Sequence, residues 1–267
     1  MKYLYIFYKK IITVLATPVM VRYFFDKKIG RYYGFGIRKK LKLLRSVRRN
    51  VRNIESASDW QEHLKMISVI LSIPPSIKGD LIECGTFRGA SAASLSLAAA
   101  ITGRRLIVAD SFEGLPKPRE NDQKHFSQLK IKHKTYEKGQ YTGTLEEVQN
   151  NIRRFGAIKS CEFLKGFFDQ TLPSIQKRRF VFIFLDVDLS SSLEDCLKNL
   201  WPLFEKNCLL FSHEAQDLPY ISLFFNATWW QDNLGTYAPG FVGAGTGLPL
   251  GIAEGFSLGY TVKSDAN

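Results

Sequence analysis

Asp80-Leu-Ile-Glu-Cys-Gly-Thr-Phe-Arg-Gly89 is the stretch that decides the fold. Its first five residues predict a short buried strand, and the small side chains of residues 90–101 predict a helix directly after the turn. Gly85 and Gly89 lie in that turn and carry no Cβ, so the backbone there can approach a ligand closely. A plain tight turn is the competing interpretation, because Gly-x-x-x-Gly alone is weak evidence for a ligand site.

Strand and helix patterns alternate along the rest of the chain. Apolar runs predict further strands over residues 105–109, 160–164, 180–185 and 209–212. Helical patterns follow over residues 59–71, 144–155 and 193–200, with capping signals at Ser58/Gln61 and Thr144/Glu147. The polar segment 111–142 predicts a long loop or lid. This alternation predicts an α/β fold with a doubly wound, mostly parallel sheet, and the run 180–185 suits a central strand buried on both faces.

Acidic residues end the first two strands. Glu83 can accept a hydrogen bond from the amino group of an aminoacyl ligand, and Asp110, at the end of the next strand, is placed to bind ribose hydroxyls. A helix cap is the alternative for Asp110, since Ser111 follows it. Together the two features favour a nucleotide-like ligand but do not separate NAD from S-adenosylmethionine. The sequence fits G-x-G-x-x-G poorly, and S-adenosylmethionine has no phosphates that would require it.

Two more pairs of polar residues follow later strands. Asp186 and Asp188 come after the central strand, where the first can hold a cation and the second can take a proton; capping of the next helix is the alternative. His213 and Glu214 follow the last predicted strand. Beside Asp186 they predict a mixed nitrogen and oxygen metal site, whereas a structural histidine is the competing interpretation.

Positive charge is concentrated at the N-terminus. The net charge is +12, but residues 1–52 hold 15 Lys/Arg and one acid, Asp26, so the remainder holds 22 Lys/Arg against 24 Asp/Glu. A nearly neutral remainder argues against nucleic acid as a partner, because a nucleic-acid groove spreads cations over the folded domain. The four cysteines lack CxxC spacing and fit a reduced, cytoplasmic chain.

The N-terminal segment is predicted to be a basic, aromatic arm, residues 1–57, ahead of a catalytic domain, residues 58–267. Apolar residues recur at helical spacing between Ile37 and Ile54, with Lys and Arg in the other positions. One interpretation is peripheral contact of residues 1–52 with an anionic membrane; the other is a helix packed on the domain with a solvated cationic face. The apolar run 11–21 is short for a spanning helix, which needs about 20 residues.

The ordered motifs resemble the macrocin O-methyltransferase family over residues 58–215. They are Gly79–Ser91, Asp110-Ser-Phe-Glu-Gly-Leu-Pro116, Tyr141–Asn151, Phe163–Phe168 with Thr171-Leu-Pro173, and Leu185-Asp-Val-Asp-Leu189. The resemblance implies a Rossmann-like class I S-adenosylmethionine-dependent methyltransferase that methylates a sugar hydroxyl. Its partner would be a small-molecule or glycan acceptor, and a homo-oligomer stays open.

The resemblance also implies roles for individual residues. Cofactor contacts fall on Glu83, Gly85, Thr86, Gly89, Ser91, Asp110, Ser111, Gly166, Phe167 and Asp186. Asp188 is the implied general base. Asp186 and the pair after the next strand are the implied ligands of Mg²⁺ or Mn²⁺. Here the sequence departs from the family, because His213-Glu214 stands in place of Asp-Asp; either the metal differs or it is absent.

The sequence therefore predicts an S-adenosylmethionine-dependent O-methyltransferase acting on a hydroxyl of a sugar or glycosylated metabolite, with or without metal assistance. A catalytically inactive or metal-independent S-adenosylmethionine-binding protein at a membrane is the first alternative. An NAD-linked oxidoreductase is the second, and the missing phosphate fingerprint weighs against it. The glycine-rich stretch 240–259 matches no family motif.

Overall fold

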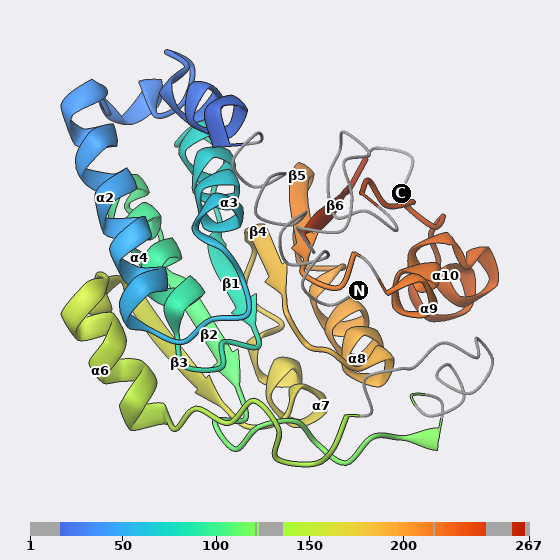
Figure 1. The fold of residues 1–267 in the computed structure, drawn as a ribbon. Coiled ribbons are helices and arrows are strands. Elements are labelled where there is room, and N and C mark those ends of the chain that lie inside the picture. Colours follow the sequence, from blue (N-terminus) through green and yellow to red (C-terminus); the bar gives the residue numbers. More distant parts are fainter. Residues whose placement is uncertain (1–16, 121, 123–135, 216, 244–257, 265–267) are drawn as a thin grey trace, which may run out of the picture.

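The computed structural model describes residues 17–120, 122, 136–215, 217–243 and 258–264 (Figure 1). Its core is a six-stranded sheet in the order β3-β2-β1-β4-β5-β6. The strands are β1 (Asp80–Cys84), β2 (Leu106–Asp110), β3 (Cys161–Lys165), β4 (Phe180–Leu185), β5 (Phe204–Ser212) and β6 (Gly259–Val262). The first five are parallel and β6 pairs antiparallel with β5. The predicted α/β fold with a mostly parallel sheet is confirmed.

Helices cover both faces of the sheet. Figure 1 shows α2, α3, α4 and α6 together on one side and α7 and α8 on the other. Besides a helical segment over residues 17–25, the helices are α2 (Ile37–Asn53), α3 (Trp60–Ser72), α4 (Ala90–Thr102), α6 (Leu145–Phe155), α7 (Phe168–Thr171), α8 (Ser190–Leu200), α9 (Leu218–Ile221) and α10 (Ala227–Leu234). Short 3₁₀ turns lie at η1 (Arg31–Tyr33), η2 (Ile158–Ser160), η3 (Leu172–Ile175) and η4 (Ser222–Phe225). Strand β4 is buried along its whole length, as its apolar run predicts.

The sheet order reverses between β1 and β4, which leaves a crevice at their carboxyl ends. Gly85 lets the ends of β1 and β4 approach each other closely. The Asp186 amide donates to the Cys84 carbonyl at 2.9 Å. A Cβ on Gly85 would lie 1.8 Å from the Asp186 carbonyl oxygen, and the Gly85 φ is +82°. Only glycine fits there, so this position in the deciding stretch is required by the packing of two strand ends.

Two helix starts test the capping predictions. Thr144 caps α6 as predicted, because its hydroxyl accepts from the Glu147 amide at 3.2 Å. The capping box of α3 is one residue further along than predicted: it consists of Asp59 and Glu62 rather than Ser58 and Gln61. The shift matters for the site described below, because it places the Glu62 side chain at the start of α3.

The basic helix α2 packs on the domain. Leu43, Val47 and Asn50 are buried, and the Asn50 side chain lies 3.2 Å from the Ser94 hydroxyl of α4. The predicted apolar stripe is only partly inward, since Ile37 is 66% exposed. Lys40 points inward instead, and its ammonium group donates to the Asp26 carbonyl at 2.7 Å. One side of α2 is therefore packed on the domain while most of its cations stay exposed, and the boundary at residue 57 stays a prediction.

None of the helices in the described ranges is long and apolar enough to cross a bilayer. Most of the apolar run 11–21 lies outside the described residues, as do much of the predicted lid and most of the glycine-rich stretch 240–259.

Candidate active site

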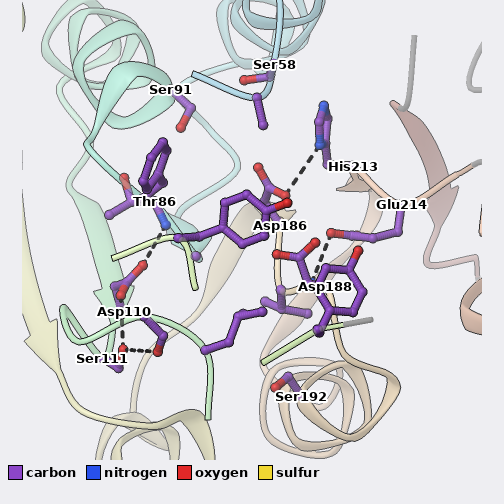
Figure 2. A pocket seen from close by; sticks show the side chains of 18 of the residues that line it. Ser58, Thr86, Ser91, Asp110, Ser111, Asp186, Asp188, Ser192, His213 and Glu214 are labelled. Carbon is purple, nitrogen blue, oxygen red and sulfur yellow. Dashed lines mark hydrogen bonds and ion pairs between the residues drawn. The ribbon is translucent and has the colours of Figure 1, made fainter. Parts of the chain in front are cut away.

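A cavity of about 300 Å³ lies at the carboxyl ends of the strands (Figure 2). It brings together most residues that the sequence singles out. Those lining it are Gly85, Thr86, Ser91, Asp110, Ser111, Phe167, Asp186, Asp188, His213 and Glu214. Figure 2 shows Thr86, Ser91, Asp110 and Ser111 toward one end, and Asp188, His213 and Glu214 toward the other. We call these the nucleoside end and the acceptor end.

Glu83 lies beneath the cavity and does not line it. Its side chain is fully buried, and the Thr86 hydroxyl donates to Oε2 at 3.4 Å. Burial raises the pKa of Glu83 to about 8. Within the described part of the chain, Oε1 has no hydrogen-bond partner. A buried oxygen without a hydrogen-bond partner costs folding free energy. Oε1 is therefore suited to accept a hydrogen bond from a ligand donor, such as the amino group of an aminoacyl ligand.

Gly89 and Gly166 also lie outside the lining and shape its turns. Gly89 precedes α4 with a φ of +84°, and a Cβ there would approach Val148 of α6 to 3.0 Å. The Gly166 amide donates to the Asp110 carbonyl at 2.9 Å, which ties the turn after β3 to the end of β2. These glycines therefore shape the turns that lead to α4 and Phe167, and their contact with a cofactor stays a prediction.

Asp110 fixes the loops of the nucleoside end. Its Oδ2 accepts from the Thr86 amide and its Oδ1 from the Phe112 amide, each at 2.7 Å. The Ser111 hydroxyl donates to the Gly114 carbonyl at 2.7 Å. Burial raises the pKa of Asp110, while these amide bonds oppose the shift. The carboxylate thus serves as a loop cap and, because it lines the cavity, keeps lone pairs available to a ribose.

An aromatic wall, which the sequence analysis does not predict, covers part of the cavity. It consists of Phe87, Tyr136 and Tyr141. The Phe87 and Tyr141 rings meet edge to face at 5.9 Å, and the Tyr136 and Tyr141 rings are 6.5 Å apart. Tyr136 also hydrogen-bonds Asp188; burial and then the Asp188 charge raise the pKa of this phenol. Aromatic side chains within a polar loop were the available clue.

His213 lies between two carboxylates at the acceptor end. Its Nδ1 is 3.4 Å from Asp186 Oδ1, and its Nε2 is 3.5 Å from Glu62 Oε2. Burial alone would lower the pKa of His213, but the two carboxylates outweigh it and raise that pKa well above its ordinary value. The same pairing, against the effect of burial, lowers the pKa of Glu62 and of Asp186.

Glu214 is held by neighbours on its own loop and on the loop after β4. Its Oε2 accepts from the Ser212 hydroxyl at 2.6 Å, and its Oε1 accepts from the Asp188 amide at 3.2 Å. Burial raises the pKa of Glu214 to about 8, with further contributions from the charges of Asp186 and Asp188. A carboxyl group that favours its protonated form is a weak metal ligand.

The predicted metal site does not fit these residues. A histidine ligand must offer the lone pair of a neutral nitrogen, whereas both nitrogens of His213 face carboxylate oxygens that require N–H donors. Among the residues the structure describes, no group of three or more His, Cys, Asp or Glu side chains has metal-binding geometry.

Known proteins match the central part of this chain. The model of the macrocin-O-methyltransferase (TylF) family matches residues 61–210. One relative is the 8-demethyl-8-(2,3-dimethoxy-alpha-L-rhamnosyl)-tetracenomycin-C 4'-O-methyltransferase of Streptomyces olivaceus. It is 36% identical over 132 residues, which cover 47% of this chain and 49% of the relative. The mycinamicin III 3''-O-methyltransferase of Micromonospora griseorubida is 29% identical over 130 residues, 47% of this chain and 51% of the relative. The matches thus span about half the length of these curated relatives.

Solved structures agree on the fold. The O-methyltransferase NovP superimposes with a TM-score of 0.58 at 18% identity, covering 94% of this chain and 99% of NovP. A calicheamicin methyltransferase gives a TM-score of 0.54 at 15% identity, covering 85% of this chain and 93% of that protein. The family match extends over more than half of the sequence, from α3 into β5, and includes the strand ends that carry Glu83, Asp110 and Asp186. The chain belongs to the macrocin-O-methyltransferase family.

Proposed function

We propose that this chain is an S-adenosylmethionine-dependent O-methyltransferase that acts on a hydroxyl of a sugar or glycosylated metabolite. The most direct support is that two carboxylates lie at opposite ends of one cavity. Asp110 is placed to bind ribose hydroxyls, and Asp188 is the candidate base. The curated relatives point the same way, since their names describe O-methylation of glycosylated natural products.

The nucleoside end suits S-adenosylmethionine. Asp110 would accept from the ribose hydroxyls, Glu83 from the amino group, and Phe167 would pack near the adenine. When bound, S-adenosylmethionine supplies a methyl group already activated by its sulfonium. The protein's main task is therefore to position the acceptor hydroxyl in line with that methyl group and to exclude water. The aromatic wall of Phe87, Tyr136 and Tyr141 offers apolar faces against which a sugar ring can pack.

Asp188 is the proposed general base. As the new oxygen–carbon bond forms and the sulfur–carbon bond breaks, its carboxylate takes the proton of the acceptor hydroxyl. Tyr136 holds this carboxylate by a hydrogen bond. The Asp188 amide is fixed on Glu214, so the base is held from both its backbone and its side chain.

The test pairs a binding measurement with a turnover measurement. Calorimetry with S-adenosylhomocysteine should show binding, and mass spectrometry should show methylated product from a panel of glycosides. Asp188→Asn should leave the binding unchanged and lower turnover about a hundredfold, the usual contribution of a general base. Asp169→Asn, on the exposed surface of α7, is the matched control and should lose nothing.

Two outcomes would contradict the proposal. Failure of S-adenosylhomocysteine to bind would remove the methyltransferase assignment, and binding of NADH instead would favour the oxidoreductase. Binding without turnover of any acceptor would favour the inactive scaffold.

We also propose that the N-terminal face contacts an anionic membrane surface. The supporting observation is a set of exposed cations on the segment 17–53: Arg22, Lys27, Lys28, Arg31, Arg38, Lys39, Lys42, Arg45, Arg48, Arg49 and Arg52. Val19, Tyr32, Ile37 and Leu41 are exposed among them. Cations mixed with apolar and aromatic side chains suit a phospholipid interface. A lipid-linked or surface glycan would then be a natural acceptor.

Vesicle sedimentation tests this contact. The full chain should bind vesicles that contain phosphatidylserine, and salt should weaken the binding. Replacing Arg38, Lys42, Arg45 and Arg49 together by Gln should remove about 4 kcal/mol, at roughly 1 kcal/mol per cation. The control replaces Lys117, Lys138, Lys177 and Lys206, all exposed and outside this segment. Equal binding by the two quadruple variants would contradict a dedicated surface.

A further inference from the structure

We propose that His213 is held as an imidazolium cation by Glu62 and Asp186. This cation lies at the acceptor end, where the family resemblance implies a divalent metal ion. Methyl transfer would then proceed without a bound metal. Glu62 and Asp186 are positioning residues in this proposal, and His213 acts through its positive charge, since both of its nitrogens face carboxylates. The inference rests on the proposed O-methyltransferase function and deepens it.

The first argument is the geometry of His213. The ring is 11% exposed, and each of its nitrogens faces one carboxylate oxygen, at 3.4 Å and 3.5 Å. A neutral imidazole carries one N–H and one lone pair, so it satisfies one carboxylate and opposes the other. Only the imidazolium donates to both. The same contacts leave no nitrogen lone pair for a metal ion, which is why the cation and the metal are alternatives.

The second argument is the rigidity of the arrangement. Glu62 belongs to the capping box of α3, where its Oε2 also accepts from the Asp59 amide at 2.7 Å. The His213 amide donates to the Leu185 carbonyl at 2.9 Å, and the Asp186 amide to Cys84. Glu62 in α3, Asp186 directly after β4 and His213 directly after β5 are thus each held by the hydrogen bonds of a regular element. A charge held in advance stabilises a developing alkoxide without the cost of reorganisation.

The third argument is the balance of charge around the cavity. Asp186 and Asp188 line it, and Glu62 faces the second nitrogen of His213. No Lys or Arg lines the cavity in the described part of the chain. Without a cation, the carboxylates would repel the negative charge that develops on the acceptor oxygen as Asp188 takes its proton. His213 is the lining residue that offsets this charge, which is the electrostatic task that a metal performs in other enzymes.

The first experiment measures metal binding directly, and its calorimetric part needs no acceptor. Manganese is titrated into the purified full chain by calorimetry, and S-adenosylhomocysteine is titrated in parallel. We expect no manganese binding by the wild-type protein, and turnover that EDTA leaves unchanged. Manganese binding that Asp186→Asn abolishes would overturn the inference, as would loss of turnover in EDTA with recovery on adding Mg²⁺ or Mn²⁺.

The second experiment tests the positioning role. Glu62→Gln keeps an oxygen for the Asp59 amide but removes one carboxylate from His213. We expect kcat to fall about tenfold or more, while the KM for S-adenosylmethionine and the melting temperature stay unchanged. Glu146→Gln is the matched control, because it also removes an acid from the first turn of a helix, but on the exposed side of α6. An unchanged kcat in Glu62→Gln would overturn the role of Glu62.

The two proposals fail in different ways. If the wild-type protein methylates no acceptor, the proposed function fails, and the calorimetry with manganese still decides whether His213 excludes a metal. If the protein methylates an acceptor but needs a divalent ion, the proposed function stands and this inference fails.

Discussion

His63 should make folding stability depend on pH, and the size of the effect follows from its surroundings. The side chain is fully buried, with Nε2 at 2.7 Å from the Ser58 hydroxyl and Nδ1 at 3.1 Å from the Ser94 hydroxyl. Ser94 donates to the Ala90 carbonyl, so it accepts from Nδ1–H and leaves Nε2 to accept from Ser58. These contacts satisfy a neutral ring. Burial accordingly lowers the pKa of His63 from 6.5 to about 4.

The sign of the effect follows from which state binds the proton. In the unfolded chain His63 titrates near its ordinary pKa of 6.5, and in the folded protein it stays neutral down to about pH 4. Stability is therefore fully present above pH 6.5 and is lost as the pH falls toward 4. The total is about 3 kcal/mol, from a shift of roughly 2.5 pKa units at 1.36 kcal/mol each. At pH 5 the loss is already about 2 kcal/mol.

The assay is urea denaturation of the wild-type protein and of His63→Gln at about pH 7.5 and pH 5. Glutamine is neutral throughout and can still hydrogen-bond one of the two serines. Other carboxyl groups change stability over this range in both proteins, so the difference between the two losses isolates His63. We expect the wild-type protein to lose about 2 kcal/mol more than the variant. Parallel losses in the two proteins would refute the reasoning.

Three further predictions concern the cavity and the C-terminal helices. Gly85→Ala should lower the free energy of unfolding by about 2 kcal/mol or more and weaken S-adenosylhomocysteine binding. The alanine Cβ would overlap the Asp186 carbonyl, and the backbone φ at this position is +82°. Urea denaturation would measure the first effect and calorimetry the second. Asp110→Asn should weaken the same binding about tenfold, since an amide cannot accept from both the Thr86 and Phe112 amides; unchanged affinity would remove Asp110 from the site. Trp230→Ala should lower the free energy of unfolding by about 3–5 kcal/mol, because this buried ring packs on Trp201 with 4.8 Å between the ring centroids. A smaller loss in urea denaturation would mean that α10 contributes little to the core.

The first four strands were predictable because each is a short, mainly apolar run that ends at, or is followed at once by, glycine or an acid, whereas β6 was not predicted. The third predicted strand, residues 160–164, is observed at Cys161–Lys165, and the central run coincides with β4. The last predicted strand was too short, since β5 begins at Phe204. Residues 205–207 are polar and partly or fully exposed, so their composition resembles that of a loop. They lie at an irregularity of β5, between Phe204, which pairs with Phe180, and Leu209, which pairs with Phe182. The Asn207 amide donates to the Lys263 carbonyl at 2.7 Å.

The site was less predictable because its key contacts join residues far apart in the sequence. Asp186 and His213 were visible as polar residues at strand ends. Glu62 was not, because the box at the start of α3 was placed one residue early and its true N3 acid was overlooked. The sequence also cannot show that His213 turns both nitrogens to carboxylates. A metal ligand and a buried cation look identical as the letters His-Glu, and only the neighbours of the ring distinguish them.

Backbone strain supports a functional role for the Asp188 carboxylate. Five non-glycine residues in the described ranges have a positive φ: Phe87, Phe112, Tyr141, Asp188 and Asn207. Three of them line the cavity. Asp188, at +57°, occupies the left-handed conformation, which aspartate adopts more readily than most residues but less readily than glycine. Glycine would relieve the remaining cost but would remove the carboxylate. This unfavourable conformation lies at the acceptor end of the cavity, and a simple substitution could relieve it. Such strain is expected where the side chain is needed for chemistry.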